Sequence, residues 1–240
     1  MNVRALTEYS GTTPQRHTSL FESLLSPAPE FKLSLADDEN RYETEDFIQK
    51  KFHKIYAAYI DEFYPVILCM RCFGSLSATA GMRVARSTPL FLEQYLDQNI
   101  EVELSQLIGS EISRNSIVEI GNLVASQRGA SHILFLLFTT ILHRAGYQWI
   151  TFTTTRALQN NLRKLGFELH YLCEADPSKL EPKSGSDWGT YYNTQPQVVA
   201  GNLDNAMQII QSRPLFRRIL RLYRSRINAL VVEFKSAHYD

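Results

Sequence analysis

The 240-residue sequence has little cysteine, no excess of charge of either sign and no long apolar run. Three cysteines are too few, and odd in number, for a disulfide scaffold, so a reducing compartment is favoured. Twenty-five basic residues balance twenty-five acidic ones, so the overall charge gives no argument for a nucleic-acid partner. The N-terminus lacks the apolar core of a secretory signal, and no apolar run is long enough to span a membrane. We therefore predict a soluble, cytoplasmic protein that binds no nucleic acid.

Several catalytic templates are also missing. The sequence contains no His-Glu-x-x-His pair, no Gly-x-Ser-x-Gly elbow and no Gly-x-x-x-x-Gly-Lys-[Ser/Thr] loop, and its six histidines are scattered. Cys69 and Cys72 have the spacing of a metal or redox pair. However, they lie in a run that predicts a strand, where residues three apart point to opposite faces. We expect two ordinary strand cysteines and no metal site.

The remaining composition is sufficient for one substantial core. A hydrophobic content of 44% over this length favours a single α/β or α+β domain. Residues 1–28 are polar and predict a flexible N-terminal arm, and residues 29–212 are assigned to the folded domain. Hydrophobic periodicity predicts strands at 30–35, 64–71, 76–86, 116–125, 149–154 and 168–173, a last short strand within 188–201, and helices at 44–59, 133–142 and 155–164, with two helical pieces in 89–109.

The turn at 126–131 is the most informative segment. After Arg128 it contains no side chain larger than a hydroxymethyl group, so its amides can approach a bound anion closely. Gly121-Asn122 interrupts the strand before it, as a β-bulge would. The helix at 133–142 is apolar on nearly every face and should be buried, with its N-terminal amides directed at the turn. This arrangement suits a pyrophosphate.

The C-terminal stretch, residues 213–240, predicts a basic amphipathic helix. Its apolar face is Phe216, Leu220, Tyr223, Ile227, Leu230 and Phe234, and much of the rest is Arg217, Arg218, Arg221, Arg224 and Arg226. One interpretation is a helix docked on its own domain with solvated arginines. The other is a helix that binds a partner, an acyl-carrier protein or a membrane surface. Both interpretations stay open.

Several segments, in order and spacing, resemble the bacterial thermostable haemolysin family. They are PLFLEQYLD at 89–97, IVEIGNL at 117–123, FTTTRAL at 152–158, LGF at 165–167, EADP at 174–177 and WGTYY at 188–192. The resemblance extends from about residue 41 to residue 203. The family is grouped with GNAT-like and autoinducer-synthase-like acyltransferases. It therefore implies a mixed, mostly antiparallel central sheet flanked by helices, with the fourth and fifth strands splayed apart.

In a GNAT-like fold, the turn after the fourth strand carries the coenzyme A pyrophosphate, with the signature [QR]-x-x-G-x-[GA]. Gly129 occupies the first glycine position, but Ser126 and Ser131 depart from the signature at its two ends. The resemblance thus implies a coenzyme A or acyl-carrier-protein thioester as co-substrate. The residues implied to bind it are Leu123, Val124, Ala125, Gln127, Arg128, Gly129, Ala130, Ser131, His132 and Asn160. A structural turn without ligand is the alternative.

Acyl transfer also needs a base and an acid for the leaving thiolate. GNAT-like enzymes often carry the base on the fourth strand, where Glu119 lies, and partial burial would raise its pKa. The alternative is a solvent-facing or arginine-paired Glu119. The tyrosine that many such enzymes use as the acid corresponds here to Leu162, so Tyr191 and Tyr192 are predicted instead, with aromatic packing as their alternative role. The residues assigned to the acceptor site are Arg83, Glu93, Arg114 and Asn122.

We therefore predict a GNAT-type acyltransferase that moves an acyl group from the thioester to an amine or hydroxyl of a small metabolite. The family name records red-cell lysis, so a membrane-active or lipid-binding protein acting through the C-terminal helix is the alternative. A third interpretation is an inactive relative whose turn binds a ligand without turnover. A homodimer and a peripheral membrane contact through the C-terminal helix also stay open.

Overall fold

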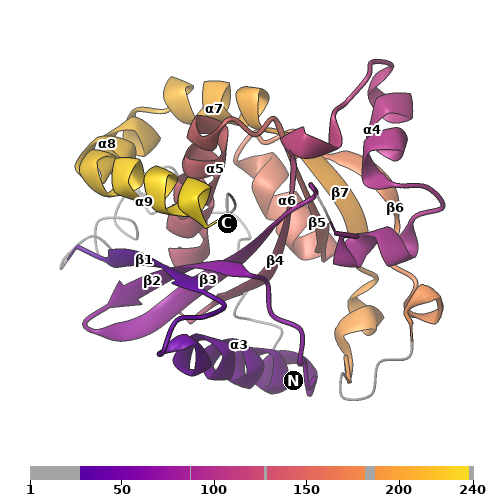
Figure 1. The fold of residues 1–240 in the computed structure, drawn as a ribbon, viewed down its shortest axis with the longest axis horizontal. Helices are drawn as coiled ribbons and strands as arrows, with labels where there is room; N and C mark the ends of the chain where they lie inside the picture. The colour runs from indigo at the N-terminus through magenta and orange to yellow at the C-terminus, as the bar shows by residue number, and fades with distance from the viewer. Residues whose placement is uncertain (1–27, 87, 127–128, 182–186, 238–240) are drawn as a thin grey trace.

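A seven-stranded mixed sheet runs through the computed structural model, which describes residues 28–86, 88–126, 129–181 and 187–237 (Figure 1). The strands are β1 (Glu30–Leu35), β2 (Val66–Cys72), β3 (Ser75–Val84), β4 (Ile117–Ala125), β5 (Trp149–Thr154), β6 (His170–Glu174) and β7 (Gln197–Asn202). They lie in the order β1-β2-β3-β4-β5-β7-β6. Every neighbouring pair is antiparallel except β4 and β5. The predicted GNAT-like, mostly antiparallel α/β class is confirmed.

Helices cover both faces of this sheet. They are α3 (Arg41–Tyr56), α4 (Ile100–Ile108), α5 (Ala130–Ala145), α6 (Arg156–Lys164), α7 (Leu203–Ser212), α8 (Pro214–Leu222) and α9 (Arg224–Ser236). Figure 1 shows α3 on one face of β1 to β4, and α5, α8 and α9 on the other. The middle of α5 is buried on every side, as its uniformly apolar sequence predicts. None of the helices in the described part of the chain is long and apolar enough to span a bilayer.

The C-terminal segment differs from the single helix that the sequence predicts. It forms two helices, and the chain turns between them at Tyr223. The break lets the segment follow α5 and then reach β1, where the Tyr223 ring packs edge-on against Phe31 at 4.9 Å between centroids. Its apolar face is buried in the main core, so the docked interpretation describes the structure. The prediction of one helix was wrong because the apolar spacing continues unbroken through the turn.

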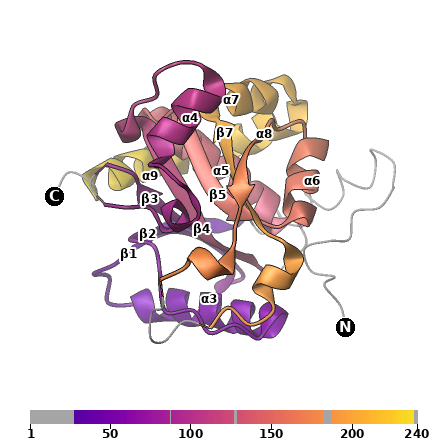
Figure 2. The ribbon, with the colours of Figure 1, turned by 90° about the vertical axis from the view of Figure 1, so that its right-hand side faces the viewer.

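Two segments next to the central strands differ from a simple periodic reading of the sequence. The segment Phe91–Tyr95 is a 3₁₀ helix rather than an α-helix. The last strand, β7, lies inside the sheet between β5 and β6. Residues 1–27 of the predicted N-terminal arm lie outside the described residues. Figure 2 views the molecule from the side on which α4 lies.

The sheet opens between β4 and β5. The two strands pair only from Ile117 to Glu119, where Glu119 lies opposite Thr151, and then separate. A bulge in β4 accompanies the separation: the register with β3 shifts, and Asn122 adopts a left-handed backbone with φ 46°. The Thr79 hydroxyl donates to the Asn122 carbonyl at 2.9 Å and holds the bulge. The predicted splayed strand pair is thereby confirmed.

Candidate active site

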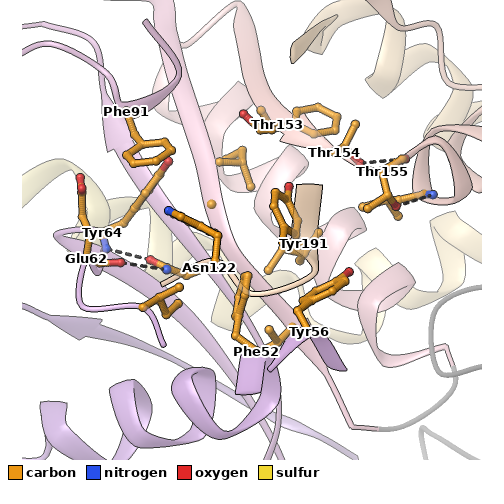
Figure 3. Close-up of a pocket in the computed structure, with 18 of the residues that line it drawn as sticks. Phe52, Tyr56, Glu62, Tyr64, Phe91, Asn122, Thr153, Thr154, Thr155 and Tyr191 are labelled. Atoms are coloured by element: carbon orange, nitrogen blue, oxygen red, sulfur yellow. Dashed lines mark hydrogen bonds between the residues drawn. The ribbon is translucent and has the colours of Figure 1, made fainter. Parts of the chain in front are cut away.

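A cavity fills the space between the separated strands (Figure 3). Its volume of about 130 Å³ exceeds several-fold the ~10–15 Å³ that one water molecule needs. One side is β4 from Ile120 to Ala125, and the other is Phe152 to Thr155 with Leu158 of α6. Because β4 beyond Glu119 has no strand partner on this side among the described residues, part of its backbone edge is available to a ligand.

Aromatic side chains close the cavity on the α3 side. Phe52 and Tyr56 come from the last turns of α3, and the Tyr191 ring lies 6.4 Å and 5.2 Å from their centroids. Trp188 and Phe91 extend this wall with centroids 5.6 Å apart. These rings come from three separate segments of the chain, and all of them line the cavity. Such a wall favours an apolar group in the cavity.

Glu119 lies behind the cavity wall and is 1% exposed. Its carboxylate accepts hydrogen bonds from the backbone N–H groups of Phe91 (3.0 Å) and Leu92 (2.8 Å), so it anchors the start of the 3₁₀ helix. Burial raises its pKa from 4.5 to about 7, although the Leu92 amide, the Arg83 guanidinium and the Tyr64 hydroxyl all favour the charged form. A carboxylate with such a pKa can exchange protons at neutral pH.

A polar cluster lies at the same end of the cavity. Arg83, opposite Glu119 on β3, pairs with Glu62 at 2.9 Å. The Asn122 side chain accepts from the Tyr64 amide at 2.8 Å and donates to the Glu62 carbonyl at 3.3 Å (Figure 3). Of the residues predicted for the acceptor site, Asn122 lines the cavity, and Arg83 does not line it but pairs with Glu62, which does. An acceptor-binding role for both stays a prediction.

The other two predicted acceptor residues lie elsewhere. Arg114 donates to Glu93 at 2.6 Å and to Glu101 at 2.7 Å. The Glu93 carboxylate also accepts from the backbone N–H groups of Leu90 and Ile100. Neither Arg114 nor Glu93 lines the cavity. Their contacts hold the 90–101 segment together, and an acceptor-binding role for them stays a prediction.

The two predicted tyrosines have different surroundings. Tyr191 lines the cavity, and burial raises its pKa. Tyr192 does not line the cavity, and its hydroxyl lies 2.5 Å from the hydroxyl of Tyr95. Burial raises the pKa of Tyr192 to about 12. Tyr95 lines the cavity, and the pair that its hydroxyl forms with Tyr192 is partly buried.

The predicted phosphate turn leads from the far end of the cavity into α5. Leu123, Val124 and Ala125 line the cavity, and Gly129 caps α5 with φ 85°, a left-handed conformation that favours glycine. Ala130, Ser131 and His132 form the first turn of α5. Gln127 and Arg128 lie outside the described residues. Asn160 is exposed on α6 and does not line the cavity. A groove beside Ser126 is lined by the lysines Lys50, Lys51 and Lys54 of α3.

Sequence reasoning missed Tyr64, Glu62 and every ring of the aromatic wall except Tyr191. The signal for Tyr64 was a pair of glycines inside strands, because a strand glycine often marks the close approach of another group. Gly81 and Gly121 lie opposite each other on β3 and β4. A Cβ atom on Gly121 would lie 2.5 Å from Cζ of Tyr64. The wall had no signal, because its rings meet only through tertiary contacts.

The fold and the cavity define a GNAT-like α/β protein with a cavity of about 130 Å³ between β4 and β5. The sequence matches the family model described as thermostable hemolysin over residues 35–207, and the chain belongs to this family. No curated protein matches the sequence.

Solved structures with a similar arrangement include acyl-transferring synthases. FeeM, an N-acyl amino acid synthase from uncultured soil microbes, aligns over 79% of this chain and 98% of its own at 11% identity and a TM-score of 0.52. The AHL synthase LasI aligns over 73% and 90% of the two chains at 12% identity with a TM-score of 0.49. The coenzyme A-dependent acyl-homoserine lactone synthase BjaI aligns over 84% and 90% at 10% identity with a TM-score of 0.48. At these identities, the likeness to FeeM shows a shared fold.

Proposed function

We propose that the protein is an acyltransferase that moves an acyl group from a coenzyme A or acyl-carrier-protein thioester to an amine or hydroxyl of a small metabolite. The observation that carries the proposal is the cavity between β4 and β5, which has the buried Glu119 cluster at one end and the start of α5 at the other. A fold alone does not define a function, so the proposal rests on the chemistry of this cavity. FeeM, by its name an N-acyl amino acid synthase, has the same fold.

The donor fits the cavity in one direction. The open edge of β4 from Ile120 to Ala125 offers backbone hydrogen bonds to the amides of a pantetheine arm. The N-terminal amides of α5, with its helix dipole, favour the donor's phosphates. In the groove next to Ser126, Lys51 and Lys54 have no carboxylate partner among the described residues, which favours a donor that carries a nucleotide.

The thioester end of the donor would lie at the opposite end of the cavity, near the Glu119 cluster. The thioester carbonyl and the acceptor would meet near Tyr64, Glu62 and Asn122, and the aromatic wall would accommodate the acyl chain. Glu119 would accept the proton that the nucleophile loses, since its pKa of about 7 matches the working range of a general base.

The alternative, lysis through the C-terminal helix, requires an apolar face that is free to enter a membrane. In the structure that face is part of the core: Phe216, Ile227, Leu230 and Phe234 are all at most 4% exposed. Lysis by this route would require α8 and α9 to leave the core, whereas the acyltransferase proposal uses the fold as it stands.

The test is a charge change at the second residue of α5. Ser131→Asp places a carboxylate where it interacts favourably with the helix dipole, by about 0.3–1 kcal/mol, so the fold should not weaken. The same charge repels phosphates, and we expect the Kd for the donor to rise about tenfold or more. Ser131→Asn is the matched control because it has the same shape without the charge.

Binding would be measured by calorimetric titration with acetyl-coenzyme A, a long-chain acyl-coenzyme A and free coenzyme A. A loss of affinity in the Asp variant alone, with thermal stability kept, supports the proposed donor site. Equal affinity in the Asp and Asn variants would contradict it. Absence of binding to all three in the wild type would rule out a coenzyme A donor and leave the carrier-protein thioester to be tested.

A further inference from the structure

Tyr64 is held in place from both sides of its backbone. It lies in the segment between α3 and β2, where its N–H donates to the Asn122 side chain at 2.8 Å. Its carbonyl accepts from the guanidinium of Arg41, which is itself buried and also donates to the Ser34 carbonyl at 2.7 Å. Two side chains from distant parts of the sequence therefore fix this one residue.

The Tyr64 side chain packs against β3 and β4 at two glycines, Gly81 and Gly121, which have no side chain to displace it. A Cβ atom on Gly121 would lie 2.5 Å from Cζ and 2.7 Å from the hydroxyl oxygen, and one on Gly81 would lie 2.9 Å from the Tyr64 Cβ. The Arg83 guanidinium lies over the ring, 4.5 Å from its centroid. Only glycine at these two strand positions lets the phenol pack so closely.

This placement brings the Tyr64 hydroxyl to Glu119. Glu119 and Gly121 are two residues apart on β4 and share one face of the strand up to the bulge. The hydroxyl lies beside Gly121, and its interaction with the Glu119 carboxylate lowers the pKa of that carboxyl, against the effect of burial. Each Glu119 oxygen also accepts one backbone N–H, so the carboxylate is fixed in orientation.

Tyr64 reaches the cavity, whereas Glu119 does not line it. A proton that moves between a ligand and Glu119 must therefore pass through an intermediary. Glu62 also lines the cavity, but its carboxylate is paired with Arg83. Tyr95 lines the cavity as well, but its hydroxyl is paired with that of Tyr192. The charged and titratable groups that face Glu119 are thus Arg83, Tyr64 and, at longer range, Tyr95.

We propose that Tyr64 is the catalytic residue that contacts the acceptor and passes its proton to Glu119, which acts from behind it. The inference rests on the proposed acyltransferase function. The acceptor nitrogen or oxygen forms its bond to the thioester carbonyl carbon and gives its proton to the Tyr64 oxygen, while the Tyr64 hydroxyl proton moves to Glu119. As the carbon–sulfur bond breaks, the same two transfers run in reverse and protonate the leaving thiolate. Both residues end in their starting states.

The relay also supplies the acid that the sequence lacks at Leu162. One phenol–carboxylate pair serves first as base and then as acid, so a second tyrosine is not needed. A purely structural Tyr64 would fill the same space, since its ring packs on the two glycines in either case. The structural role and the relay role differ only in whether they need the Tyr64 hydroxyl, and Tyr64→Phe removes that group alone.

The experiment uses the full-length protein and compares Tyr64→Phe, Glu119→Gln and the double variant with Tyr223→Phe. The control removes another buried phenol hydroxyl, one with no hydrogen-bond partner among the described residues and remote from the cavity. The first readout is an NMR titration of the Glu119 side-chain carboxyl carbon in Tyr64→Phe. Loss of a donor to the carboxylate should raise its midpoint by about one pH unit. An unchanged midpoint would overturn the proposal.

The second readout is the release of free thiol from acyl-coenzyme A with hydroxylamine as the probe acceptor. We expect kcat to fall about 100-fold or more in Tyr64→Phe and in Glu119→Gln, with no further loss in the double variant and no change in donor Kd. A Tyr64→Phe protein within about threefold of the wild type, or losses that multiply in the double variant, would contradict the relay while acyl transfer stands. A wild type that binds donors but releases thiol no faster than the protein-free mixture would overturn the proposed function, and the relay with it.

Discussion

The ionisation of Glu119 should destabilise the folded protein. Its pKa is 4.5 ordinarily and about 7 in the fold, because burial disfavours the charged form. The folded state therefore holds this proton more tightly than the unfolded chain, and stability from this group is present at low pH and lost as pH rises to 7. Each pKa unit is worth about 1.4 kcal/mol, so the total loss is about 3 kcal/mol, most of it between pH 5 and pH 8. The side chain is completely buried, so solvent screening does not reduce this figure.

The perturbation that isolates this effect is Glu119→Gln. The amide cannot ionise, and it retains only one acceptor oxygen for the two backbone N–H groups, which adds a cost independent of pH. Free energies of unfolding would be measured by urea titration at several pH values for both proteins. We expect the wild type to lose about 2–3 kcal/mol relative to the variant between pH 5 and pH 8. Two curves that run parallel over this range would refute the reasoning.

Three further predictions follow from the same geometry. Because the base must be ionised, kcat should rise about tenfold per pH unit below pH 7 and level off above it, which a pH–rate profile would test. Gly121→Ala should cost about 1–3 kcal/mol because the new methyl overlaps the Tyr64 ring, whereas Gly201→Ala, with no neighbour nearer than 3.6 Å, should be tolerated in thermal melts. Deletion after Ser212 should prevent folding, as judged by circular dichroism, because the side chains buried by α8 and α9 contribute roughly 1.5–3 kcal/mol each.

The sequence predicts those elements whose side chains carry a local pattern. The bounds of β1 and β5 agree with prediction to the residue, because polar–apolar alternation marks β1 and β-branched and aromatic residues mark β5. The burial of α5 follows from its apolar residues on every face. The bulge at Asn122 follows from a glycine and an asparagine inside a strand, the two residue types that most readily adopt left-handed backbone.

Elements whose local pattern is ambiguous were predicted less well. Phe91, Leu92 and Tyr95 have the same spacing in a 3₁₀ turn as in an α-helix, so periodicity cannot separate the two. The turn at Tyr223 leaves the apolar spacing of the C-terminal segment intact, because both helices bury the same face against α5, and α9 also contacts β1. The place of β7 between β5 and β6 depends on pairing between distant segments, which no local pattern records.

The residues of the candidate site show the same difference between what a local pattern predicts and what only the tertiary fold decides. Glu119 could be placed on β4 from alternation, but its burial comes from Phe91 and Leu92, which lie 28 and 27 residues earlier. Tyr64 precedes its strand as one aromatic among many, and its role depends on two glycines in other strands. The sequence supplies the residues of the site, and the tertiary fold decides which of them meet.

The burial of Glu119 itself bears on function. A chain selected only to fold has an easier solution at this position, since a buried ionisable group destabilises the protein near neutral pH and an apolar or amide side chain does not. The two N–H groups of Phe91 and Leu92 give Glu119 a structural role, yet they could be satisfied by ordered water or by backbone elsewhere. Gly81 and Gly121 also leave room for the Tyr64 phenol, which lies between Glu119 and the cavity. A structural anchor requires no such connection, whereas a proton acceptor does. A buried carboxylate that destabilises the fold, with the Tyr64 phenol connecting it to the cavity, therefore favours proton transfer as the reason that Glu119 occupies this position.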